Sequence, residues 1–201
     1  LESSTNNHGI SGLINIPNAR FSDEGTTRIV LFRGDPDRKL NLTFSPFTWM
    51  EGGFYYADIT GKVYGGGFEQ SYKDKGFNVK FRLKEQGVYP ALAIGFNDFA
   101  GTGIYESEYL VSSYKFGKMD FSLGLGWGNL AGSAAISNPL KELNNRFSER
   151  DDDYGQGGDF NIDNYFAGPN VGIFGGIEYE YNSNLSLKLE YDTTELPGEV
   201  G

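Results

Sequence analysis

The chain has 201 residues and carries 27 acidic against 17 basic side chains, which gives a formal net charge of −10. Because a protein that binds phosphate backbones normally presents a basic face, this acid excess argues against nucleic acid as a partner. The absence of cysteine excludes a disulfide framework, a thiolate metal site and a cysteine nucleophile. No run of about 18 apolar residues occurs, which excludes a helical membrane span but not a span made of strands.

The composition is typical of a sheet protein with many turns, because it includes 29 glycines, 15% aromatic residues and only two methionines. Nothing in it changes sharply enough to mark two domains, so residues 1–201 are expected to form one domain. The amino end, "LESSTNNHG", lacks the basic and apolar regions of a secretory signal and is predicted to be a solvated tail. Its His8 is the single histidine of the chain, which argues against a zinc site with several histidines and against a Ser-His-Asp relay.

Strand-like alternation of apolar and other residues runs along almost the whole chain and predicts roughly ten strands. In chain order they are "GLINI" near residue 14, "TRIVLFR" near 30, "KLNLTFS" at 39–45, "GFYYADI" near 56, "FNVKFRLK" at 77–84, "ALAIGFND" near 94, "SEYLVSSYKF" near 111, "MDFSLGLGWG" at 119–128, "GIFGGIEYEY" near 176 and "LSLKLEYD" at 185–192. Helical spacing is confined to "NPLKELNNRF", where Pro139 is placed to open a short helix.

Short joints rich in Gly, Asn, Asp and Pro connect most of these strands, so neighbouring strands are expected to be antiparallel and to form a meander of hairpins. Two longer segments interrupt the meander. Residues 61–76 are predicted to be a glycine-rich loop, and residues 131–168 a long polar excursion. Loops of this length inside a compact sheet are usually functional or mobile.

The segment "MDFSLGLGWG" places large apolar groups on one face and mainly glycine and serine on the other. Period two alone does not distinguish the inside of a sheet from its outside. The remaining strands carry charges of both signs on the face that is not apolar, and this favours an outer-membrane-type barrel with apolar residues outward. The predicted lipid-facing residues are Phe121, Leu123, Leu125 and Trp127. The predicted lumen residues are Lys80, Arg82, Glu178, Glu180, Lys188 and Glu190.

The predicted fold is therefore all-β, an antiparallel meander that closes into an outer-membrane-type β-barrel of roughly ten strands. Glycine on the inward side would let a small barrel close without crowding its interior. The alternative that leaves the same alternation intact is a soluble, lipocalin-like barrel whose apolar face points inward.

Three long stretches, in order, resemble one protein family: "GISGLINIPNARF" at 9–21, residues 71–128 from "SYKDKGFNVKF" to "LGLGWG", and the closing "LSLKLEYD". They look like the YjbH/GfcD-type exopolysaccharide (capsule) biosynthesis outer-membrane proteins of Gram-negative bacteria. The resemblance runs through most of the chain and is weakest in 131–168. It implies an outer-membrane β-barrel, often a lipoprotein, that acts with periplasmic partners in secretion of a polysaccharide.

Three features depart from that family. Its members are far longer than this chain, no lipoprotein cysteine is present, and the chain ends in "ELPGEVG" instead of on an aromatic-ended strand. The chain is therefore expected to correspond to the amino-terminal barrel portion of a longer protein, or to a short relative.

Few residues are candidates for catalysis, glycan binding or metal binding. Carboxylates near "NDFAGTGIYESE", among them Asp98 and Glu108, could flank a sugar, and Tyr64, Tyr72, Asp98 and Tyr105 are the predicted glycan contacts. The acidic loop repeats Asp159, Asn161 and Asp163 at two-residue spacing but lacks the glycine and glutamate of an EF-hand, so no metal is assigned. No cofactor motif is present, and no catalytic residue is assigned.

The function hypothesis is a non-enzymatic outer-membrane barrel in exopolysaccharide or capsule biosynthesis and export, with a structural or docking role. Its expected partners are outer-membrane lipid, exopolysaccharide and periplasmic export proteins. The alternatives are a soluble periplasmic or secreted β-barrel that binds a small ligand, and a glycan-acting hydrolase that uses paired carboxylates.

Overall fold

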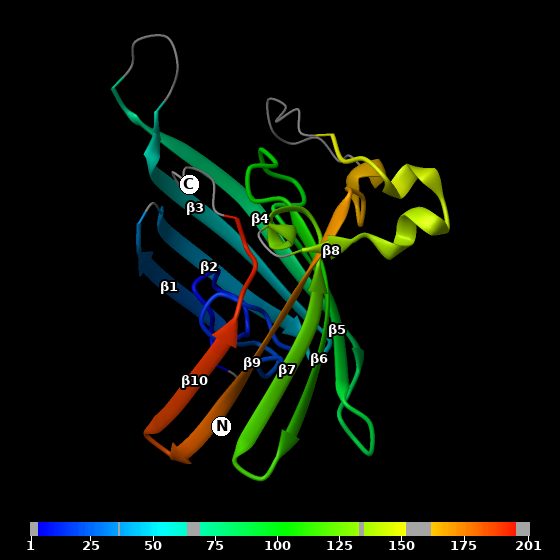
Figure 1. Cartoon of the computed structure of the whole chain (residues 1–201). Coiled ribbons are helices and arrows are strands. Elements are labelled where there is room, and N and C mark those ends of the chain that lie inside the picture. Colours follow the sequence, from blue (N-terminus) through cyan, green and yellow to red (C-terminus); the bar gives the residue numbers. More distant parts are fainter. Residues whose placement is uncertain (1–3, 36, 64–68, 133–134, 152–161, 196–201) are drawn as a thin grey trace.

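A computed structural model describes residues 4–35, 37–63, 69–132, 135–151 and 162–195. Within them, ten strands belong to one antiparallel sheet whose main path is β1-β2-β3-β4-β5-β6-β7-β9-β10, with β8 paired to β9 at its end (Figure 1). No helix in the described part of the chain is long and apolar enough to cross a membrane.

The strands are β1 (Thr27–Arg33), β2 (Asp37–Phe47), β3 (Met50–Val63), β4 (Ser71–Lys84), β5 (Ala91–Asn97), β6 (Ser107–Phe116), β7 (Met119–Gly126), β8 (Ile136–Ser137), β9 (Asn170–Asn182) and β10 (Leu185–Tyr191). Four short 3-10 helices lie between β7 and β9: η1 (Gly128–Ala131), η2 (Pro139–Glu142), η3 (Asn145–Phe147) and η4 (Ile162–Asn164). The predicted all-β antiparallel meander is confirmed, and the helix predicted to open at Pro139 is present as η2.

Nine of the ten predicted strands are present, and the prediction of a strand near residue 14 is wrong. That segment makes only isolated bridges, between Thr5 and Ser11 and between Gly12 and Pro17. Its backbone N–H groups are satisfied instead by side chains of the sheet, among them Glu51 and Glu190. The short strand β8 was not predicted, because two residues carry no alternation that could be recognised.

The predicted loop boundaries also need correction. Residues 61–63 belong to β3 and 71–76 belong to β4, so the loop predicted over 61–76 is shorter than expected. The alternation is hidden here because the sheet continues past its apolar zone, with polar side chains such as Lys73 and Asp74 on both faces. The excursion predicted over 131–168 holds β8 and three of the short helices.

The sheet is curved, and its two faces differ in chemistry. Side chains on the convex outer face are mainly large and apolar, whereas the concave inner face holds many polar and small residues together with buried rings such as Tyr109 and Phe174. Inward glycines make room for aromatic rings of the neighbouring strand. A Cβ at Gly95 would lie 2.2 Å from the Tyr109 ring, and one at Gly124 would lie 2.2 Å from the Phe174 ring. The inward Gly95 of β5 and Gly124 of β7 are therefore packing sites for rings.

The sheet is not closed into a barrel within the described residues, where β1 pairs only with β2 and β10 pairs only with β9. The predicted closure is thus not present in this part of the chain. The direction of the strands gives the reason: nine strands follow one another antiparallel along the main path, so the first and the last run in the same direction. Direct closure would need a parallel pair in an otherwise antiparallel sheet.

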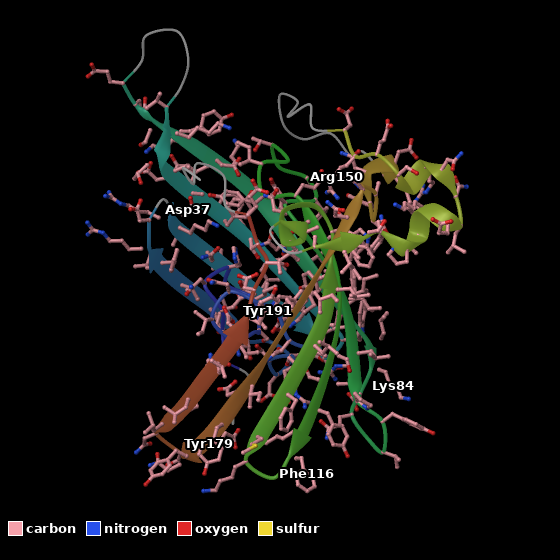
Figure 2. All side chains as sticks on the ribbon, in the orientation of Figure 1. Asp37, Lys84, Phe116, Arg150, Tyr179 and Tyr191 are labelled. Carbon is pink, nitrogen blue, oxygen red and sulfur yellow. The ribbon has the colours of Figure 1, made fainter. Side chains whose placement is uncertain are left out.

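Residues 4–22, called here the strap, lie within the curve of the sheet (dark blue in Figure 1). Ile10, Leu13 and Ile16 of the strap pack with Tyr109 and Phe174 in the largest apolar cluster of the inner face. Residues 4–9 of the predicted solvated tail therefore belong to a partly buried structural element. Short hairpin turns gather at one end of the sheet, where Figure 2 labels Lys84, Phe116 and Tyr179, and the longer connections gather near Arg150 at the other.

Candidate functional site

The outer face presents an apolar surface along all the long strands. Three of the four predicted lipid-facing residues lie on β7: Leu123 is 64% exposed, Phe121 is also exposed, and Leu125 is half-buried. Similar residues continue this surface over the neighbouring strands, namely Leu40, Leu42 and Phe44 of β2, Phe77 and Leu83 of β4, and Leu187 and Leu189 of β10. Large apolar side chains exposed in such a continuous surface normally meet another apolar phase.

A row of charged side chains limits this apolar surface at the long-loop end. Arg38, Asp58 and Lys73 are register neighbours on β2, β3 and β4, and the Lys73 Nζ lies 2.6 Å from an Asp58 carboxylate oxygen. The next outward side chains beyond Tyr56 and Phe77 are polar, namely Asp58 on β3 and Lys75 and Lys73 on β4. The outer face therefore has an apolar zone with a defined edge, a pattern typical of a sheet that leaves a lipid phase for water.

Trp127 does not lie on the exposed apolar surface where the sequence placed it, since it is only 5% exposed. Its indole packs edge-on against Phe166, with ring centroids 5.1 Å apart, and its Nε1–H donates to the Asn138 side chain at 3.2 Å. Both partners come from the covering segment, defined as the described residues 135–151 and 162–168, and Phe166 also packs on Phe96 of β5. The lipid-facing prediction for Trp127 was wrong in this respect, because a segment distant from the strand covers the ring.

Arg150 fastens this covering segment to the sheet. Its guanidinium donates two hydrogen bonds of 2.9 Å to the Glu108 carboxylate and lies 3.0 Å from Glu106. The Phe166 backbone N–H donates to Glu108 at 2.8 Å. Burial raises the pKa of Glu106, an effect that Arg150 opposes by favouring the charged form.

On the inner face, Glu51 of β3 and Lys80 of β4 form an ion pair of 2.8 Å in which both side chains are fully buried. The pair also holds the strap. The backbone N–H groups of Ser11 and Ser22 each donate to Glu51 at 3.1 Å, and Ser11 Oγ donates to the same carboxylate. Lys80 donates to the Arg20 carbonyl at 2.6 Å. These bonds satisfy charges that would otherwise be costly to bury.

The middle and the amino end of the strap are held by β10 and β9. Glu190 accepts hydrogen bonds from the backbone of Ile14 at 2.9 Å and Asn15 at 2.8 Å, and Lys188 donates to the Leu13 carbonyl at 2.8 Å. Glu178 accepts from Ser4 Oγ at 2.8 Å. All six predicted lumen residues lie on the inner face, which the structure brings together around the strap and the cleft beside it.

An open cleft of about 580 Å³ lies at the short-turn end, between the strap and the inner ends of β4, β6, β7, β9 and β10. Its charged walls consist of ion pairs, with Arg20 bound to Asp120 at 2.7 Å and Lys115 bound to Glu180 at 2.7 Å. Arg82 lies over the Phe21 ring, 4.7 Å from its centroid. Planar polar groups and an aromatic ring of this kind suit a ligand rich in hydroxyl groups.

The predicted glycan contacts are not gathered in this cleft. Asp98 and Tyr105 are 2% and 6% exposed in an interior polar cluster, where Tyr55 donates to Asp74 at 2.8 Å and Tyr105 N–H donates to Asp98 at 3.1 Å. They are thus out of reach of an external glycan in this structure. Tyr72 packs against the same cluster, and Tyr64 lies outside the described residues.

Asp98 stands out within that cluster. Its burial, together with the nearby charge of Asp74, raises its pKa to about 7. Its backbone has φ of 53°, and its carboxylate occupies space that a Cβ at Gly76 or Gly101 would fill. A nearby cavity lined by Tyr55, Asn78 and Tyr105, among others, is about 30 Å³, which is enough for water only.

The carboxylates named for glycan hydrolysis, Asp98 and Glu108, are both buried and engaged. Within the described residues, no cluster of three or more histidine, aspartate or glutamate side chains could hold a metal ion. Asp159 and Asn161 of the acidic loop lie outside those residues, and Asp163 lies 3.5 Å from Arg146.

Sequence reasoning missed the strap. A signal was present, because Ile10, Leu13, Ile16 and Ala19 recur every three residues, a spacing that fits neither a strand nor an α-helix. Such spacing is compatible with an irregular segment that packs one side against a core.

Comparison with known proteins identifies the family to which the chain belongs. Residues 4–199 match the family described as "Exopolysaccharide biosynthesis protein YbjH". An Escherichia coli (strain K12) protein described as "Uncharacterized lipoprotein YjbH" is 37% identical over 195 residues, which cover 94% of this chain but 28% of the relative. No solved structure matches the chain. The match of nearly the whole chain and the identity to this relative agree with the resemblance in the sequence, and the chain belongs to the YjbH family of exopolysaccharide biosynthesis proteins.

Proposed function

We propose that this chain is a wall of an outer-membrane β-barrel in a Gram-negative bacterium, with a structural and docking role in exopolysaccharide biosynthesis and export. The observation that carries the proposal is the inverted sheet: large apolar side chains are exposed on the outer face, whereas the ion pair of Glu51 and Lys80 is fully buried on the inner face. In water this arrangement would be unfavourable, whereas in a bilayer it puts each face in the phase that it matches.

The dimensions of the apolar zone support a membrane span. On β4 the outward apolar residues run from Phe77 to Leu83, and on β10 they run from Leu185 to Tyr191. At about 3.4 Å per residue, six steps cover roughly 20 Å along the strand. Because strands in outer-membrane barrels are tilted by about 35–45°, this corresponds to roughly 15 Å along the membrane normal, more than half of their apolar band of about 25 Å.

The comparisons support the biological setting. The family is described by exopolysaccharide biosynthesis, and the E. coli relative is described as a lipoprotein, a class of protein anchored to a membrane. The partners of this chain would then be outer-membrane lipid, the exopolysaccharide and periplasmic export proteins. The role is binding and support, without turnover.

The soluble ligand-binding barrel has less support, because it requires an apolar interior with room for a ligand. The strap and polar side chains occupy much of the described inner face, one cavity beside the strap is about 30 Å³, and the larger cleft has charged walls.

Quenching of tryptophan fluorescence by brominated lipid tests whether the outer face of the sheet contacts lipid. In a Trp49→Phe variant the remaining tryptophan is Trp127, which the covering segment shields. The matched variant W49F/L123W adds a tryptophan at an outward position in the middle of β7. In bilayers of brominated lipid we expect strong quenching of the added emission and little quenching of Trp127 alone.

The two variants differ by one outward side chain, so the difference between them reports lipid contact at position 123. Equal, weak quenching of both variants, from protein that also folds in plain buffer, would overturn the membrane wall. The soluble alternative would then replace it.

The cleft at the short-turn end is the docking surface that this function would use. Ser186 lies in its wall, whereas Ser112 lies on the outer face. We expect Ser186→Trp to lower the affinity for exopolysaccharide fragments of the producing strain at least tenfold, as measured by isothermal titration calorimetry. Ser112→Trp is the control, and an equal affinity in both variants would remove the cleft from the proposal.

A further inference from the structure

The sheet has two open edges. Among the described strands, β1 has β2 as its only ladder partner, and β10 has β9. One side of each edge strand therefore presents backbone N–H and C=O groups without a ladder. In lipid, every such group must be satisfied within protein, so an open edge is incompatible with a membrane wall.

The number of strands determines what could fill the opening. The main path has nine strands, all antiparallel to their neighbours, so β1 and β10 run in the same direction. An added strand can be antiparallel to both edges only if the number of added strands is odd. The completed barrel would then have an even number of strands, as bacterial single-chain outer-membrane barrels do.

The side chains at the edges match such an addition. Ile29 and Leu31 of β1, and Leu187 and Leu189 of β10, are all exposed on the outer face and extend the apolar zone to both edges. On the inner face, Lys188 carries a charge like those of the strands further along the sheet. The outer face thus stays apolar, and the inner face stays polar, up to both edge strands.

The strap spans the opening on its inner side. Arg28 of β1 donates to Ser11 Oγ at 3.2 Å, and two residues further along, the Leu13 carbonyl accepts from Lys188 of β10. Ile14 and Asn15 are bound to Glu190. The strap therefore connects the two edge strands from within, and among the described residues it forms no ladder with either of them.

We propose that an odd number of further strands, from the same polypeptide but outside these residues, pairs antiparallel with both β1 and β10 and completes the barrel. This inference rests on the proposed function of the chain as a membrane wall. The source is favoured by length, because the chain spans 28% of the E. coli relative, which leaves most of that protein available for additional strands.

A second copy of this chain fits the edges less well. Two copies that share one orientation in the membrane would bring β1 of one beside β10 of the other, and these strands would be parallel. Pairing like edges antiparallel would require one copy to be inverted relative to the membrane, which insertion from one side does not produce.

Photo-crosslinking in the protein as its own cell makes it tests the proposal. p-Benzoylphenylalanine is placed at Ile29 on β1 or at Leu189 on β10, and the crosslinked peptides are identified by mass spectrometry. Phe121 is the control, because its neighbours lie on β6 and β9. We expect Ile29 and Leu189 to crosslink to peptides of the same polypeptide from outside residues 1–201, and Phe121 to crosslink only within them.

Amide hydrogen exchange of the same protein completes the test, with exchange in β1 and β10 expected to be as slow as in the central strand β4. Crosslinks between β1 and β10, crosslinks to a different polypeptide, or rapid exchange along both edges would each overturn the proposal. These readouts do not depend on lipid contact. If the proposed membrane wall is wrong, the tryptophan at position 123 is not quenched by lipid. If the inference about added strands is wrong, the crosslinks do not reach peptides outside residues 1–201.

Discussion

The two faces of a single strand show how differently the inner and outer regions of this protein are built. On β4, the outward Phe77 and Leu83 are exposed, and their hydrocarbon side chains have no hydrogen-bonding groups. The inward Asn78 and Lys80 are buried, and both are bound, Asn78 to the Asp98 backbone and Lys80 to Glu51 and the strap. The inner face is specified by paired polar groups, whereas the outer face is specified only by being apolar. Substitutions should therefore have different consequences on the two faces.

The largest effect is expected from breaking the buried pair on the inner face. Glu51→Gln leaves the Lys80 ammonium buried without its counter-charge, which should reduce the free energy of unfolding by about 3–5 kcal/mol. The strap should then become accessible to protease. Denaturant unfolding and limited proteolysis measure the two effects.

Glu85→Gln is the control, because it removes the partner of Arg82 in an ion pair whose carboxylate is largely exposed. It should change the stability by no more than about 1 kcal/mol. Equal effects of the two substitutions would show that burial of the pair does not distinguish the faces.

A pH dependence should also originate on the inner side, at Asp98. Its pKa of about 7 in the folded protein is above the ordinary value near 4, so the folded state holds a proton that the unfolded state has lost between these values. Its stabilising contribution is complete below about pH 4 and is lost as the pH rises through 7, by up to about 4 kcal/mol.

Unfolding of wild type and Asp98→Asn across pH 4 to 8 measures this contribution. The asparagine variant should lose less stability over that range, because its side chain does not titrate. The same slope in both proteins would contradict the assignment to Asp98.

On the outer face, a charge should matter only if lipid is present. Leu123→Arg should cost about 2–4 kcal/mol for folding into a bilayer, because an arginine on the lipid face near the midplane loses its hydration. Leu143→Arg introduces the same charge at an exposed position in the segment between η2 and η3 and should have no such cost. Folding titrations in bilayers measure both, and equal costs would mean that position 123 does not face lipid.

The smallest effect is expected from the glycines of the inner face. Gly124→Ala puts a methyl group 2.2 Å from the Phe174 ring, and the resulting overpacking should cost about 1–3 kcal/mol. Gly87→Ala is the comparison, because nothing lies within 4 Å of its added methyl group. Thermal unfolding that is equally affected in both would show that the glycines do not serve as packing sites for rings.

The sequence predicted the sheet well because alternation along a strand records the two faces directly. Nine strands, their antiparallel order and the inward side of Lys80 and Glu190 could all be read in this way. The covered position of Trp127 could not be predicted from the sequence, because its neighbours Asn138 and Phe166 come from a segment without periodicity.

The candidate site was only partly predictable for a related reason. The charges on the inner face were recognised, but the partner they bind is the strap backbone, and backbone acceptors leave no trace in side-chain patterns. The burial of Asp98 was also hidden, because the glycines at 76 and 101 that accommodate it resemble loop residues in the sequence. Closure was overestimated, since alternation reveals strands but not whether their number allows the two edges to pair.

The strap also has a consequence for how the chain folds. Its residues are the first to be synthesised among those described, yet Ser4 is bound to Glu178 and Ile14 to Glu190, contacts separated by 174 and 176 positions. Contacts this distant carry a large loop-closure entropy and form slowly. Docking of the strap should thus follow formation of the β9–β10 hairpin and be a late folding event among the described residues.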